Sequence, residues 1–226
     1  MMVGIKIVGV HERDHMIDSM NRQLQLPAGD IIYDERPGGG YAFPILKKAW
    51  LDPYAEEETH RVVLNDDLEL CDNFREICEQ IAKAQPNSIV SFFTTYLNSS
   101  FCDQEIQKIQ TPYIRHDVGI FGCAIMMPKN VAIECMGYTS MNYPDIKFES
   151  RAFTQFAKER GIPIITTLPC LVQHLGDSSL VDKALPIRRT MRFEKHPETD
   201  WSAKEVIELK TMTEMTRPLM KPINWK

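Results

Sequence analysis

The chain has 226 residues, of which 43% are hydrophobic and 25% charged, and its formal net charge at pH 7 is −5. This length suits one large α/β domain better than two complete domains. The acidic balance argues against a protein that mainly grips nucleic-acid phosphates without specificity. The longest apolar stretch, 118–127, is shorter than the roughly 20 residues that a membrane helix needs.

Strands and helices are expected to alternate along the chain, because β-branched apolar runs are separated by helix-compatible stretches with polar ends. In chain order the expected elements are a strand at 4–10, a helix at 14–24, a strand at 30–34, a loop at 36–40, a helix at 44–50, a strand at 61–64, a helix at 72–84, strands at 88–94 and 119–127, a helix at 149–160 and a strand at 162–167. Asp72 is predicted to cap its helix, and Gly161 to end the last one.

This alternation predicts an α/β fold with a mostly parallel central sheet flanked by helices. Ligands of such sheets bind beyond the carboxyl ends of the strands. The strand expected at 61–64 ends on Asn65, Asp66 and Asp67, so this acidic pair is expected at the binding edge. Residues 1–184 are expected to form the domain, and 185–226 a C-terminal extension packed on it.

The cysteines indicate no metal-binding or redox motif, because they are widely spaced and form no CxxC pair. They are Cys71, Cys78, Cys102, Cys123, Cys135 and Cys170. The first ten residues lead into the polar stretch 11–14 without the basic and apolar regions of a secretory signal, so a cytoplasmic protein is expected. In a reducing cytoplasm the cysteines are expected to be free thiols, several of them in the core.

Two adjacent carboxylates at a strand end are costly to bury unless a positive charge offsets them, and a divalent cation does so while also neutralising a diphosphate. Oxygen ligands suit Mg²⁺ or Mn²⁺, and one imidazole, for which His174 is the candidate, favours Mn²⁺. Two structural alternatives stand beside this hypothesis. Asp66 and Asp67 could cap the following helix, and His174 could be an ordinary hydrogen-bonded histidine.

Three segments, in this order, resemble signatures of glycosyltransferases with the GT-A fold. The segment 61–70, RVVLNDDLEL, resembles their metal-binding acidic motif in its x-Asp-Asp variant, and 119–124, GIFGCA, resembles a Gly-rich strand on the acceptor side. The segment 168–180, LPCLVQHLGDSSL, resembles the late PSLVQHxG motif. Two positions depart from the pattern, because Asn65 replaces the first acidic residue and Cys170 a common serine.

The resemblance implies a GT-A fold in which Asp67 and His174 bind the metal. It implies a nucleotide-sugar site made of Val10, His11, Glu12, Arg13, Asp34, Gly39, Tyr41, Asn65 and Asp66. An inverting member needs a carboxylate to deprotonate the acceptor, and Glu149, with Asp145 in reserve, occupies the corresponding place. Glu149 could instead be an acidic first-turn residue that favours the helix dipole.

The predicted function is a metal-dependent transfer of a sugar from a nucleotide-diphosphate sugar, UDP-linked in the favoured case, to an acceptor hydroxyl. The compact chain is similar to small bacterial or bacteriophage enzymes, for which the location would be the host cytoplasm. A hydroxymethylated pyrimidine in DNA is the favoured acceptor and a cell-surface glycan the alternative. Side chains compatible with either acceptor are Tyr96, Phe101, Tyr113 and Tyr138 and the basic cluster Arg188, Arg189, Arg192 and Lys195.

Two functions of other classes are alternatives to the transferase. A nucleotidyltransferase usually has a Gly-rich, Lys-containing loop after the first strand, and 11–14 does not provide one. A non-catalytic nucleotide-sugar-binding domain would keep the fold and lose the chemistry, and Asn65 keeps this alternative open.

Overall fold

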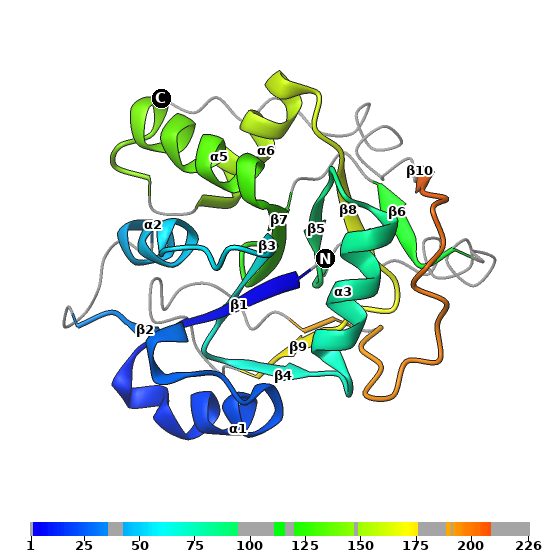
Figure 1. Cartoon of the computed structure of the whole chain (residues 1–226), viewed down its shortest axis with the longest axis horizontal. Helices are drawn as coiled ribbons and strands as arrows, with labels where there is room; N and C mark the ends of the chain where they lie inside the picture. The colour runs from blue at the N-terminus through cyan, green and yellow to red at the C-terminus, as the bar shows by residue number, and fades with distance from the viewer. Residues whose placement is uncertain are drawn as a thin grey trace, which may run out of the picture.

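The computed structural model describes residues 2–35, 43–94, 111–115, 120–146, 149–175, 189–190 and 192–208. Its centre is an eight-stranded sheet of order β10-β6-β8-β5-β7-β3-β1-β2 (Figure 1). The strands are β1 (Met2–Gly9), β2 (Ile31–Tyr33), β3 (Glu58–Asn65), β5 (Ile89–Ser91), β6 (Tyr113–Arg115), β7 (Ala124–Pro128), β8 (Ile164–Thr167) and β10 (Ile207–Glu208). A separate two-stranded sheet pairs β4 (Leu68–Leu70) with β9 (Val172–His174).

The central sheet is mostly parallel, as the sequence predicted. Strands β2, β1 and β3 pair in parallel, and so do β5 and β8. Strand β7 lies between β3 and β5 and is antiparallel to both. Strand β6 is antiparallel to β8, and β10 is parallel to β6. The α/β class and the flanking helices are therefore confirmed, with three strands, β7, β6 and β10, reversed relative to the other five.

Helices cover both faces of the sheet (Figure 1). They are η1 (His11–Arg13), α1 (Asp14–Leu24), η2 (Ala28–Asp30), α2 (Phe43–Leu51), α3 (Phe74–Ala84), α5 (Lys129–Asn142) and α6 (Glu149–Arg160). Helices α2, α5 and α6 share one buried cluster, and α1 and α3 share the other. Neighbouring residues of β3 divide between the two clusters, because Val63 faces the first and Leu64 the second.

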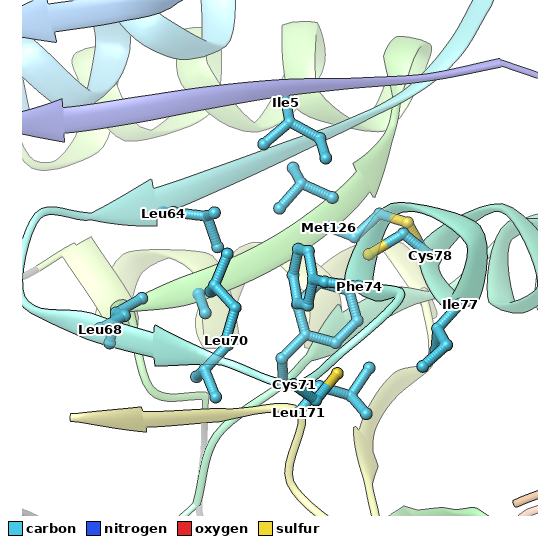
Figure 2. Packing of buried hydrophobic residues seen from close by; sticks show 14 of the residues in the cluster. Ile5, Leu64, Leu68, Leu70, Cys71, Phe74, Ile77, Cys78, Met126 and Leu171 are labelled. Atoms are coloured by element: carbon cyan, nitrogen blue, oxygen red, sulfur yellow. The ribbon is translucent and has the colours of Figure 1, made fainter. Parts of the chain in front are cut away.

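Phe74, the first residue of α3, lies at the centre of the cluster under α1 and α3. In Figure 2 its ring lies among Leu70, Cys71 and Met126. It also meets the Phe92 ring edge-on, with 5.3 Å between the ring centroids. This packing fixes the start of α3 just after β4, which carries the chain away from the acidic pair.

The predicted cap of α3 was wrong. The helix begins after Asn73, whose φ of 54° is left-handed, and Asp72 is not the capping residue. Instead the Asp72 amide donates to the Lys195 carbonyl, and its carboxylate pairs with His196 at 2.7 Å. Tertiary contacts with a distant segment therefore outweigh the local capping preference of aspartate.

Helix α5 was not predicted, because its apolar residues do not gather on one side. Val131, Cys135 and Met136 are buried, yet Ile133 and Met141 are exposed and blur the periodicity. Helices α1 and α6, by contrast, have the predicted bounds.

The described part of the C-terminal extension packs against the same core. Phe193 forms a bridge to Cys170, and Trp201 is buried and accepts a hydrogen bond at its carbonyl from the Tyr113 hydroxyl at 2.6 Å. Strand β10 then joins the edge strand β6. Residues 192–208 are therefore structurally part of the domain.

Five cysteines lie in the described residues and all are free and buried, as expected; Cys102 lies outside them. Within the same residues, no helix combines the length and apolar character needed to cross a membrane.

Candidate functional site

The candidate site lies where β2, β1 and β3 end side by side. Gly9 pairs with Tyr33, and Val8 pairs with Asn65, so the residues that follow these strands share one edge of the sheet. The Asp34 amide donates to the Gly9 carbonyl at 2.8 Å. This arrangement brings four segments predicted for the nucleotide sugar to one place: 10–13, Asp34, Asn65 and Asp66.

The small β4–β9 sheet joins the two ends of the proposed metal site. Leu68 pairs with His174, and the Leu175 amide donates to the Asp67 carbonyl at 2.7 Å. As a result the Asp67 Oδ2 and His174 Nε2 atoms lie 3.2 Å apart. The two residues predicted as metal ligands are thus neighbours in the structure.

Arg13 lies between the two carboxylates. Its Nη1 donates to Asp66 Oδ1 at 2.8 Å and to Asp67 Oδ2 at 2.6 Å. The Val10 amide donates to Asp66 Oδ2 at 3.0 Å, and Gly9 leaves the space that Asp66 fills, since a Cβ there would lie 2.6 Å from the Asp66 Cβ. The loop after β1 therefore binds the acidic pair directly.

Among the described residues, the two carboxylates of this cluster share the guanidinium of Arg13. Burial, followed by the charge of Asp67, raises the pKa of Asp66 even though Arg13 opposes the change. Burial would lower the pKa of Arg13, but the charges of Asp67 and Asp66 outweigh it and the pKa is raised. The guanidinium is therefore held firmly as a cation, while burial beside Asp67 disfavours the charged form of Asp66.

The donor atoms of Asp67 and His174 fit a divalent cation. Two ligands at about 2.1 Å and at a right angle are about 3.0 Å apart, close to the observed Oδ2 to Nε2 distance. In addition, Asp67 Oδ1 and His174 Nδ1 are buried and have no hydrogen-bond partner among the described residues. Within the described residues, no group of three or more His, Cys, Asp or Glu side chains is placed to hold a metal.

The helix-cap alternative for the acidic pair is wrong. Asp66 and Asp67 precede strand β4, and the next helix begins only at Phe74. Both carboxylate side chains are nearly inaccessible, at 7% and 5% exposure. Such burial of two like charges indicates a task that helix capping does not explain.

Glu149, the predicted base, begins α6 and is buried, whereas Asp145 is exposed. The Glu149 carboxylate fills the space beside Gly122, where a Cβ would lie 1.7 Å from Oε1. Burial raises the pKa of Glu149. The adjacent Cys123, whose pKa is raised first by burial, also senses the charges of Asp67 and Glu149, which places both carboxylates near the same loop.

The raised pKa of Glu149 predicts that replacing its carboxyl group by a neutral amide stabilises the fold, by an amount that depends on pH. An acid whose folded-state pKa is raised costs stability as pH rises through the window between its unfolded value, about 4.3, and its higher folded value. Glu149→Gln is therefore expected to stabilise the fold more at pH 8 than at pH 4, measured by urea unfolding at both values. The exposed Glu56→Gln serves as control, and an equal effect at both pH values would contradict the burial argument.

One set of contacts beside Asp67 and His174 was missed by sequence reasoning. The Gln173 side chain exchanges two hydrogen bonds with the Thr190 backbone, at 2.9 and 3.0 Å, and Arg189 Nη1 donates to the His174 carbonyl at 3.0 Å. Lys195, also of the predicted basic cluster, donates to the Leu70 carbonyl at 2.8 Å. Arg189, Thr190 and Lys195 therefore bind strands β4 and β9 through hydrogen bonds.

The aromatic residues proposed for the acceptor do not form a surface in the described part of the chain. Tyr113 is fully buried, and Tyr138 is nearly buried, with its hydroxyl donating to Glu159 at 2.9 Å. The assignment of these two tyrosines to a splayed base or a sugar is therefore wrong. Several other predicted residues lie outside the described residues: Gly39, Tyr41, Tyr96, Phe101 and Arg188.

His11 and Glu12 are exposed at the same edge of the sheet. The His11 ring stacks on the Tyr33 ring at 4.0 Å between centroids and 14° between planes. Val10 contributes its backbone amide, which donates to Asp66. An exposed stacked ring beside Asp34 is a suitable surface for a planar base.

No known protein-family profile matches the chain, and no curated protein matches it at a significant level.

Proposed function

We propose that this chain is a metal-dependent glycosyltransferase that uses a nucleotide-diphosphate sugar, with Asp67 and His174 as the protein ligands of Mn²⁺. The observation that carries this proposal is the pairing of Asp67 with His174 across β4 and β9, each with a buried side-chain atom that has no hydrogen-bond partner within the described part of the chain. A GT-A fold is part of the proposal. It is supported by parallel β2, β1 and β3, by the reversed β7, and by the small sheet that joins the two recognised motifs.

In the proposed transfer the acceptor oxygen bonds to the anomeric carbon, the bond from that carbon to the diphosphate breaks, and the acceptor proton leaves to a base. A bound divalent cation supplies charge neutralisation of the diphosphate leaving group. Glu149 is proposed to take the proton, as in an inverting reaction. Its raised pKa suits this role, because a base works best when its pKa is near the operating pH.

The donor contacts are proposed for the edge formed by β2, β1 and β3. Stacked His11 and Tyr33 would take the base, for which uracil is the first candidate, and Asp34 would approach the ribose. Asn65 and Asp66 would face the donor beside the metal. Arg13 provides a positive charge in direct contact with the acidic pair.

The experiment is donor hydrolysis across a panel of nucleotide sugars, with Mn²⁺ and with a chelator. Release of nucleotide from one donor, abolished by the chelator, is expected. That donor is then offered with hydroxymethylated DNA, unmodified DNA and cell-surface glycans, so that sugar incorporation identifies the acceptor. If the panel shows neither hydrolysis nor metal-dependent binding by thermal shift, the proposal is wrong; donor binding without hydrolysis or transfer in any arm would favour the non-catalytic binding domain.

A further inference from the structure

The position of Arg13 links the acidic pair to the donor loop. Arg13 is the last residue of η1, the single turn that follows β1, and its amide donates to the Val10 carbonyl at 3.0 Å. Its side chain is 14% exposed and its Nη1 contacts both carboxylates. The same oxygen, Asp67 Oδ2, also faces His174 Nε2 at 3.2 Å. The guanidinium thus lies against the oxygen that a cation shared with His174 would use.

Simultaneous binding of a guanidinium and a divalent cation to Asp66 and Asp67 is electrostatically unfavourable. With Arg13 in place, two carboxylates and a divalent cation would make a cluster of net charge +1 in a nearly inaccessible site, and the two cations would repel each other across a few ångströms. A diphosphate reverses this balance, because its negative charges can take the guanidinium while the carboxylates take the metal.

Resting on the proposed function, we infer that Arg13 makes binding of the divalent cation depend on the nucleotide diphosphate. Without nucleotide the guanidinium occupies Asp66 and Asp67 and excludes the free cation. When the diphosphate binds, the guanidinium transfers to its oxygens and Asp67 becomes available to the metal with His174. The metal and the nucleotide are therefore taken up together, with positive coupling between them.

The test is the affinity for Mn²⁺, followed by the electron paramagnetic resonance signal of free Mn²⁺, with and without UDP. For the native chain UDP is expected to tighten Mn²⁺ binding by about 10-fold or more, within the range usual for coupled sites. Arg13→Gln is expected to bind Mn²⁺ alone about 10-fold more tightly than the native chain, and UDP should then change its affinity by less than about 3-fold.

Two further variants separate the role of Arg13 from general effects. Arg22→Gln removes an exposed positive charge from the adjoining helix α1 and is expected to behave like the native chain. Arg13→Lys keeps the charge and is expected to keep Mn²⁺ binding weak without UDP. A gain of affinity in Arg13→Gln cannot arise from misfolding, and thermal unfolding of each variant verifies that it is folded.

Two results would overturn the inference. If native and Arg13→Gln chains bind Mn²⁺ equally in the absence of UDP, while both bind it with UDP, Arg13 does not couple the ligands and the proposed function stands. If the native chain binds no Mn²⁺ even with saturating UDP, the metal assignment itself fails and the inference fails with it.

Discussion

Asp67→Asn is expected to lower metal-dependent turnover of the nucleotide sugar by at least about 100-fold, the loss typical for removing one group that stabilises developing charge. The amide has the size of the carboxylate but lacks the negative charge that binds a divalent cation. Its effect should be seen in the initial rate of nucleotide release at saturating Mn²⁺. His174→Gln is expected to show a loss in the same assay, because His174 Nε2 faces the same carboxylate.

Asp72→Asn is the matched control for this comparison. Asp72 lies after β4, is 44% exposed and pairs with Lys195 and His196 away from the acidic pair. Its substitution should leave turnover within about 2-fold of the native rate, since exposed ion pairs contribute little. Turnover in Asp67→Asn comparable to that of the control would show that Asp67 does not hold a required metal.

Arg61→Met is expected to destabilise the fold by about 3–5 kcal/mol, because it leaves a buried charge without its partner. Arg61 is fully buried on β3, and its Nε and Nη2 donate to the two carboxylate oxygens of Glu58 at 2.8 and 3.0 Å. Its Nη1 also donates to main-chain oxygens at the end of α2, among them the Ala49 carbonyl at 3.0 Å. The measurement is the free energy of unfolding from urea titration.

The companion variants separate charge from packing at this position. Replacing Glu58 and Arg61 together by methionine should recover a large part of the loss, since no charge is then left unpaired. The exposed Arg151→Met on α6 is the control and should change stability by less than about 0.5 kcal/mol. A double variant as unstable as Arg61→Met alone would place the stabilisation in the main-chain contacts of Arg61.

The fold could be predicted where local pattern and tertiary packing agree. The buried strands β1 and β3 contain several β-branched residues each, and α6 has a clear end at Gly161. Helix α5 escaped prediction because exposed Ile133 and Met141 hide its buried side. Strands β4 and β9 have three residues each and pair with one another. This long-range pairing cannot be predicted from the local sequence pattern.

In the candidate site, too, residues with a local sequence signal could be predicted and residues defined by tertiary contacts could not. The acidic pair was recognisable from its place after a strand, and His174 from the motif around it. The role of Arg13 was not, because its partners Asp66 and Asp67 lie 53 and 54 residues away in the chain. Gln173 was likewise missed, since its two hydrogen bonds depend on a segment brought back by the fold.

The most direct test of the proposed metal centre is anomalous X-ray diffraction from crystals grown with Mn²⁺ and UDP. The account predicts a manganese peak about 2.0–2.2 Å from an Asp67 carboxylate oxygen and from His174 Nε2. With both ligands at saturation, the absence of a peak there, or a peak bound to neither residue, would contradict the assignment of Asp67 and His174 as the metal ligands.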